Sequence, residues 1–243
     1  FGQNFLIDGH VIEKIIRAAE ITKDDVVLEI GPGIGTMTQY LAEAAGEVFA
    51  VEIDKNLLPI LAETLAEYDN VTVVNEDILK VDIAALTGGR PVKVVANLPY
   101  YITTPIIMGL FENHIPATSI TVMVQKEVAD RIAAVPGNKT YGGYTAKLGL
   151  YAQVTGRFEV PPRCFMPAPH VDSAVVRIDR VDGVVPEGLD REFVARVIDA
   201  AFAQRRKTIR NSMSANGFAK DVLDAAFEAC GIASTTRAET LDV

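Results

Sequence analysis

The first half of the chain alternates short runs of Val and Ile with longer segments of helical pattern. Apolar runs that are nearly free of charge are typical of strands covered by helices on both faces. Five such runs are Val26–Ile30, Val48–Val51, Val71–Val74, Val92–Ala96 and Ile120–Val124. The helical segments between them include Thr36–Ala45, Lys55–Tyr68 and Pro105–Asn113. This order predicts an α/β fold with a mostly parallel sheet.

The alternation ends after Val124. Two further strands are expected at Gly149–Val154 and Ser173–Ile178, joined by a proline-rich loop. Beyond them the sequence has only helical patterns, at Arg191–Ala203, Lys207–Ser214 and Lys220–Cys230. Because glycine and proline cluster within Val181–Gly188, we place a domain boundary there. The expected domains are residues 1–181 and a small helical domain, residues 182–243.

Composition narrows the class of protein. Hydrophobic residues make up 49% of the chain and charged residues 23%, as in soluble globular proteins. No apolar run approaches the roughly 20 residues of a membrane span. The two cysteines and three histidines show no metal-ligand spacing, so we expect reduced thiols, no metal and a cytoplasmic protein. The net charge of −9 argues against a surface that is basic throughout. If the protein binds nucleic acid, it must do so through a local basic patch.

A glycine-rich loop follows the first expected strand. The sequence Gly31-Pro32-Gly33-Ile34-Gly35 precedes a helix, and its glycines permit a tight turn and the close approach of a ligand. The spacing is G-x-G-x-G, whereas dinucleotides bound through pyrophosphate favour G-x-G-x-x-G. Pro32 also removes an amide donor that a pyrophosphate would use. The loop therefore favours S-adenosylmethionine over a nicotinamide or flavin cofactor, with Gly31 and Gly33 as contacts.

Two acidic residues stand where the next expected strands end. Glu52 follows Val48–Val51 and can accept hydrogen bonds from both ribose hydroxyls of the cofactor. Asp77 follows Val71–Val74 and can accept from the exocyclic amine of the cofactor's adenine. Either acid alone is typical of an ordinary turn. Together with the glycine loop they predict a Rossmann-like methyltransferase fold with S-adenosylmethionine at the carboxyl edge of its sheet.

The fourth expected strand runs into Asn97-Leu98-Pro99-Tyr100. The exocyclic amine of adenine is a weak nucleophile because its lone pair is delocalised into the ring. The amide oxygen of Asn97 and a nearby backbone carbonyl can accept its two N–H bonds, which directs the lone pair toward a sulfonium methyl. Pro99 fixes the turn and Tyr100 offers a face for stacking a flipped base, although Asn and Pro are also common in plain turns. Behind a cofactor site, the motif predicts methyl transfer to N6 of adenine.

With these motifs the sequence resembles the ribosomal RNA adenine-N6 dimethyltransferases over nearly its full length, from Gly2-Gln3-Asn4-Phe5-Leu6 to Arg237-Ala238-Glu239. The resemblance implies further cofactor contacts at Asn4 and Leu6, and it also places Asn97 among them. It implies a base pocket in which Tyr100 is one aromatic wall. Phe165, in Phe165-Met166-Pro167-Ala168-Pro169-His170, is the other wall.

A basic run stands in the expected helical domain. No acidic residue lies between Asp199 and Asp221, whereas the same stretch holds Arg205, Arg206, Lys207, Arg210 and Lys220. Such a run is often only a solvated helix face. Beside a pocket for a flipped base, it is better explained as a surface for RNA phosphates, formed by Arg205, Arg206, Lys207 and Arg210. We therefore expect residues 182–243 to be an RNA-binding domain, truncated soon after Glu239 relative to the family.

Two branches of the family compete as explanations. One dimethylates two adjacent adenosines near the 3′ end of small-subunit ribosomal RNA, and the other modifies large-subunit RNA and confers macrolide resistance. Thr104-Pro105 and the segment Gln204–Ser212 resemble the first branch, which we take as the leading hypothesis. Ala168 and His170 depart from the proline and lysine of many members, which leaves the detail of the loop around Phe165 open.

A third alternative is a binding protein, a ribosome-assembly or transcription factor that keeps the fold with little catalysis. It predicts erosion of the cofactor residues or of Asn97–Tyr100, and the sequence shows none. The leading hypothesis implies the small ribosomal subunit as partner. A monomer is the default expectation.

Overall fold

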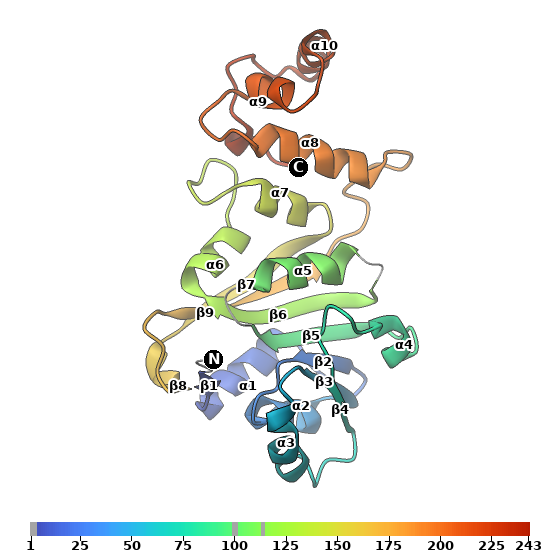
Figure 1. Cartoon of the computed structure of the whole chain (residues 1–243), viewed down its shortest axis with the longest axis vertical. Coiled ribbons are helices and arrows are strands. Elements are labelled where there is room, and N and C mark those ends of the chain that lie inside the picture. The colour runs from blue at the N-terminus through green and yellow to red at the C-terminus, as the bar shows by residue number, and fades with distance from the viewer. Residues whose placement is uncertain (1–3, 99–101, 113–114) are drawn as a thin grey trace. The chain divides into compact units, whose positions relative to one another are not determined.

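The computed structural model describes residues 4–98, 102–112 and 115–243. Its main feature is a seven-stranded sheet in the order β4-β3-β2-β5-β6-β9-β7 (Figure 1). The strands are β2 (Val26–Ile30), β3 (Glu47–Glu52), β4 (Val71–Asn75), β5 (Val92–Asn97), β6 (Ala117–Gln125), β7 (Ala152–Val160) and β9 (Ser173–Arg180). Neighbours from β4 to β6 are parallel, and β9 is antiparallel to β6. The predicted α/β fold with a mostly parallel sheet is confirmed.

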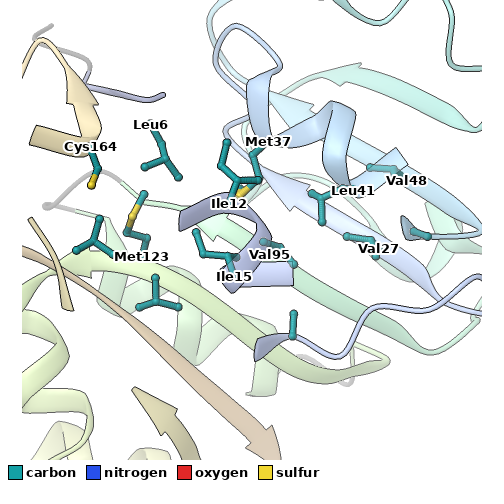
Figure 2. Packing of buried hydrophobic residues seen from close by; sticks show 14 of the residues in the cluster. Leu6, Ile12, Ile15, Val27, Met37, Leu41, Val48, Val95, Met123 and Cys164 are labelled. Carbon is teal, nitrogen blue, oxygen red and sulfur yellow. The ribbon is translucent and has the colours of Figure 1, made fainter. Parts of the chain in front are cut away.

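One face of the sheet is covered by α1 (Gly9–Ala18) and α2 (Thr36–Ala44). Ile12 and Ile15 of α1 pack in one buried cluster with Val27, Val95 and Met123 from three strands (Figure 2). The start of α1 is fixed by the Asp8 carboxylate, which accepts hydrogen bonds from two backbone amides of the first turn. This face carries the side chains that form the candidate site.

The remaining elements around the sheet include η1 (Lys55–Leu57), α3 (Leu58–Thr64), α4 (Ile83–Thr87), α5 (Thr103–Glu112), α6 (Lys126–Ile132) and η2 (Pro162–Cys164). The helix expected over 55–68 is therefore a 3₁₀ turn followed by a short α-helix, with Pro59 in the first turn of α3. A second, two-stranded sheet pairs β1 (Phe5–Leu6) with β8 (Phe165–Met166) in antiparallel register. This pairing joins segments that are far apart in the sequence.

The helices of the C-terminal part are α7 (Gly143–Gly149), α8 (Arg191–Phe202), α9 (Ile209–Ala215), α10 (Lys220–Cys230) and η3 (Ala238–Thr240). A cluster of buried apolar side chains from α8, α9, α10 and η3 forms a core in this part of the chain. The buried Ser212 hydroxyl donates to the Ala200 carbonyl at 2.7 Å and accepts from the Gln204 amide at 3.0 Å, which fixes the turn between α8 and α9.

The chain splits into two compact units. The first comprises residues 1–129 and 154–180, and the second comprises residues 130–153 and 181–243. The expected boundary placed 130–153 in the first domain, but α7 packs against α8, and Lys147 pairs with Asp199 at 2.8 Å. The expected strand over 149–154 is wrong in its first part, because Gly149 ends α7 and the strand begins at Ala152. None of the helices in the described residues has the length and apolar character needed to cross a bilayer.

Candidate cofactor and base site

The glycine loop between β2 and α2 depends on backbone conformations that favour glycine. Gly31, Gly33 and Gly35 have φ of 70°, 60° and 88°. The Gly31 amide donates to the Val51 carbonyl at 2.9 Å, which holds the loop against the end of β3. A Cβ on Gly33 would lie 3.2 Å from the Phe5 ring. The loop is therefore a tight cradle in which side chains have little room.

Glu52 is the last residue of β3 and is buried. Its Oε2 accepts from the Gly33 amide at 3.2 Å, and its Oε1 accepts from the Asp54 amide at 2.9 Å. These two bonds fix the carboxylate beside the glycine loop. Because a carboxylate has about four acceptor positions, it retains capacity for two hydroxyl donors. This geometry suits the predicted contact with a ribose.

Asp77 lies two residues beyond the end of β4, in a turn in which its Oδ1 accepts from the Leu79 amide at 3.0 Å. The neighbouring strand ends are joined by Asn75, whose Nδ2 donates to the Glu52 carbonyl at 2.7 Å. In the register of β3 and β4, Glu52 stands opposite Asn75. The structure thus places both predicted acids along one edge of the sheet.

A pocket at this carboxyl edge brings several predicted residues together. It is lined by Phe5, Leu6, Glu29, Gly31, Pro32, Gly33, Ile34, Thr36, Met37 and Asn97. Asn97 ends β5, in register with Met123 of β6, and a Cβ on Gly31 would lie 3.6 Å from its carbonyl oxygen. Of the predicted residues, Leu6, Gly31, Gly33 and Asn97 therefore line one pocket, whereas Glu52 and Asp77 are not among its lining residues.

Leu98 and Phe165 are two further predicted catalytic residues, and both are buried. Leu98 is buried and its amide donates to the Met123 carbonyl at 3.1 Å, so it anchors the motif to β6. Phe165 is 5% exposed and stands opposite Leu6 in the pairing of β1 with β8. Pro99 and Tyr100 lie outside the described residues. Asn4, just before β1, is half-buried.

Comparison with known proteins identifies the family to which this chain belongs. The family model described as ribosomal RNA adenine dimethylase matches residues 1–243. The chain belongs to the ribosomal RNA adenine dimethylase family. It is therefore an S-adenosylmethionine-dependent enzyme, and the resemblance inferred from its motifs is confirmed.

Individual relatives agree with the family. The chain is 57% identical to ribosomal RNA small subunit methyltransferase A of Lachnoclostridium phytofermentans, over 99% of this chain and 86% of that protein. It is 49% identical to the protein of the same name from Listeria innocua, over 100% of this chain and 85% of that one.

Solved structures agree as well. A dimethyladenosine transferase from Plasmodium falciparum matches with a TM-score of 0.83 and 25% identity, covering 98% of this chain and 93% of that one. The 23S rRNA methyltransferase ErmE matches with a TM-score of 0.78 and 29% identity, covering 98% and 96%.

Sequence reasoning missed one residue of this pocket, Glu29. It lies in β2, is fully buried, and lines the pocket beside the glycine loop. Burial raises the pKa of Glu29 to about 8, and the charge of Glu52 acts in the same direction while the nearby Thr38 hydroxyl opposes it. Within the described residues, neither carboxyl oxygen has a hydrogen-bond partner. The signal was present, because Glu29 is the one charged residue in an otherwise apolar strand.

Phe5, Ile34 and Met37 were also missed as lining residues. Phe5 stands in the opening segment whose neighbours Asn4 and Leu6 were predicted as contacts. Its place at the glycine loop depends on the pairing of β1 with β8, which no local pattern indicates.

The structure separates the four predicted RNA-binding residues. Arg205, Arg206 and Lys207 are exposed between α8 and α9. Arg210 is half-buried and forms a two-point ion pair with Asp224 of α10, with one of its bonds at 2.7 Å. The pair lowers the pKa of the Asp224 carboxyl. Arg210 thus already joins α9 to α10, whereas Arg206 and Lys207 make no ion pair in the described parts of the chain.

Proposed function

We propose that this chain transfers methyl groups from S-adenosylmethionine to N6 of two adjacent adenosines near the 3′ end of small-subunit ribosomal RNA. The product would be N6,N6-dimethyladenosine, formed during ribosome assembly. The observation that carries the proposal is the position of Asn97, which shares one pocket with the glycine loop. High identity to two proteins named as small-subunit methyltransferases supports small-subunit ribosomal RNA as the substrate.

The residues of the pocket fit the cofactor. Gly31 and Gly33 have no side chains, and a Cβ at either position would reduce the space for the cofactor. Beside them, the Glu52 carboxylate can still accept hydrogen bonds from the cofactor. We assign the ribose to Glu52, the adenine amine to Asp77, and further contacts to Asn4 and Leu6. When bound, S-adenosylmethionine supplies a methyl group activated by its positively charged sulfur. Alignment of the acceptor amine with that methyl provides most of the acceleration, since no general base is required.

The acceptor is held by the Asn97–Tyr100 motif. The amide oxygen of Asn97 accepts one N–H of the target adenine, and the carbonyl of the Leu98–Pro99 segment accepts the other. Tyr100 stacks on the flipped base. Phe165 is assigned to the opposite wall, although its burial also gives it a packing role between β8 and β1.

For RNA binding we propose Arg205, Arg206 and Lys207 as phosphate contacts on the helical unit. Arg210 was predicted with them, and its pairing with Asp224 gives it a supporting role in positioning α9. In this proposal the sheet-containing unit carries out catalysis, and the helical unit contacts the RNA phosphates. We expect a monomer in the cytoplasm.

A transfer assay tests the proposal. Small ribosomal subunits that lack the modification should accept labelled methyl from S-adenosylmethionine in the presence of the protein. Naked large-subunit RNA is the comparison substrate, because the resistance branch would modify it. Asn97→Ala should abolish transfer while retaining part of the cofactor binding measured by calorimetry. Absence of transfer to any small-subunit substrate would contradict the proposal and favour a binding protein.

A further inference from the structure

Buried polar atoms without partners lie together at the cofactor pocket. Glu29 of β2 and Thr38 of α2 are close enough to interact, and both are 0% exposed. Within the described residues, the two carboxyl oxygens of Glu29 and the hydroxyl of Thr38 have no hydrogen-bond partner. Buried polar side chains in folded proteins are nearly always paired, because an unpaired one costs free energy. These three atoms therefore fit a polar or charged group of a ligand.

Glu29 belongs to the lining of the pocket itself, together with Gly31, Gly33 and Asn97. The rest of the described lining is uncharged and comprises Phe5, Leu6, Pro32, Ile34, Thr36 and Met37. The charge of the pocket wall is therefore set by whether the Glu29 carboxyl is protonated.

The surroundings of Glu29 keep its carboxyl neutral in the free protein. Burial raises the pKa of this carboxyl to about 8, and the negative charge of Glu52 acts in the same direction. The Thr38 hydroxyl opposes the shift, and no lysine, arginine or histidine of the described residues contributes to this pKa. The neighbouring side chains of the buried layer are apolar: Ala50 of β3, Val95 of β5, and Ile12 and Ile15 of α1. A positive charge brought by a ligand would reverse the shift.

S-adenosylmethionine brings such a charge. It carries a sulfonium and an ammonium group against a single carboxylate, so it enters the pocket with a net positive charge. Opposite charges attract more strongly in a buried site than in water, because their surroundings screen them less. Glu52 and Asp77 are assigned to the ribose and to the adenine amine. Glu29 is then the acid of the pocket that can compensate the charge of the cofactor.

We propose that Glu29 is the counter-ion of the cofactor, a neutral acid in the free protein and a carboxylate in the complex. On binding, the O–H bond of the carboxyl breaks and its proton passes to the solvent, and no covalent bond to the cofactor forms. The proposal rests on the proposed function in taking this pocket as the S-adenosylmethionine site. The compensated group is the sulfonium or the ammonium. S-adenosylhomocysteine, the product of methyl transfer, distinguishes them because it keeps the ammonium and has no charge on sulfur.

Calorimetry of S-adenosylmethionine binding to the whole chain tests the proposal. Binding is measured at pH 6.5 in buffers of different ionisation enthalpy, and the slope of the observed enthalpy against that enthalpy gives the number of protons released. The ammonium of the ligand stays charged at this pH, since α-amino groups titrate at about 7.7–8.0. The wild type should release about one proton per cofactor, because the pKa of Glu29 is about 8 before binding.

The affinity of the wild type gives a second readout that needs no variant. Release of one proton makes binding roughly tenfold tighter per pH unit, so the dissociation constant should fall about tenfold from pH 6 to pH 7. Glu29→Gln should bind without this proton release and without this pH dependence. Glu63→Gln, which changes an exposed acid of α3, is the matched control and should behave as the wild type. Thermal unfolding shows whether the variants are folded, and the wild-type measurements decide the question if Glu29→Gln is not.

Equal proton release with S-adenosylhomocysteine would assign the ammonium as the compensated group, and release with S-adenosylmethionine alone would assign the sulfonium. Wild-type binding without proton release would overturn the proposal, and so would a folded Glu29→Gln that releases as many protons as the wild type. A wild type that does not bind S-adenosylmethionine would contradict the cofactor site, and with it the proposed function as well. Binding without proton release contradicts only the role of Glu29, so the two failures are distinct.

Discussion

Glu29→Gln should change how the stability of this protein depends on pH. The folded chain holds a proton on Glu29 up to about pH 8, because burial raises the pKa of its carboxyl from 4.5 to about 8. The unfolded chain releases that proton near the ordinary pKa. Between these two values the folded state binds more protons than the unfolded state. The contribution of Glu29 to stability is therefore present at low pH and is lost as pH rises toward 8.

The magnitude follows from the size of the pKa difference. Each pKa unit corresponds to about 1.4 kcal/mol, so the wild type should lose about 3 kcal/mol from this group between pH 5 and pH 8. That is a large share of the roughly 5–15 kcal/mol by which domains are stable. Gln has nearly the shape of the protonated acid and does not ionise. Any cost of burying its amide does not depend on pH and cancels in the comparison.

The assay is urea unfolding of both proteins at several pH values from 5 to 8. The difference in unfolding free energy, variant minus wild type, should increase by about 3 kcal/mol across this range. Glu63→Gln, which changes an exposed acid of α3, is the control and should show no such increase. Parallel curves for the Glu29 variant and the wild type would refute the reasoning, because they would mean that Glu29 is charged in the folded state.

Two other substitutions test the loop and the helical unit. Gly33→Ala should destabilise the sheet-containing unit by about 1–2 kcal/mol and weaken S-adenosylmethionine binding, because φ is 60° there and the added Cβ would contact the Phe5 ring closely. Calorimetry that finds wild-type affinity would contradict the role of the glycine loop in holding the cofactor. Ser212→Ala should destabilise the helical unit by about 1–3 kcal/mol, because the Ala200 carbonyl and the Gln204 amide lose their shared partner. Hydrogen exchange should then accelerate in α8 and α9, and unchanged exchange there would show that water replaces the hydroxyl.

Several elements could be predicted from the sequence because their pattern is local. Val26–Ile30 is an uncharged run apart from Glu29, and the structure gives the same bounds for β2. The glycine loop and Glu52 could be predicted because each directly follows one of two consecutive expected strands. The expected strand over 149–154 failed in part because an apolar run such as Leu148–Ala152 is compatible with the end of a helix as well as with a strand.

Other features depend on contacts between distant segments. The pairing of Leu6 with Phe165 joins two strands of two residues each, too short for any periodicity. The basic run of the helical domain was visible, but the ion pair that engages Arg210 comes from Asp224 on another helix. Such pairings depend on how helices and strands pack, which the pattern of one segment does not contain.

The central claim is that the pocket containing Asn97 dimethylates adenosines of small-subunit ribosomal RNA. The most direct measurement is mass spectrometry of the 3′ fragment of that RNA after unmodified small subunits react with the protein and S-adenosylmethionine. The account predicts two adjacent N6,N6-dimethyladenosines with the wild type and none with Asn97→Ala. An unmodified fragment with the wild type, or an equally modified fragment with Asn97→Ala, would contradict it.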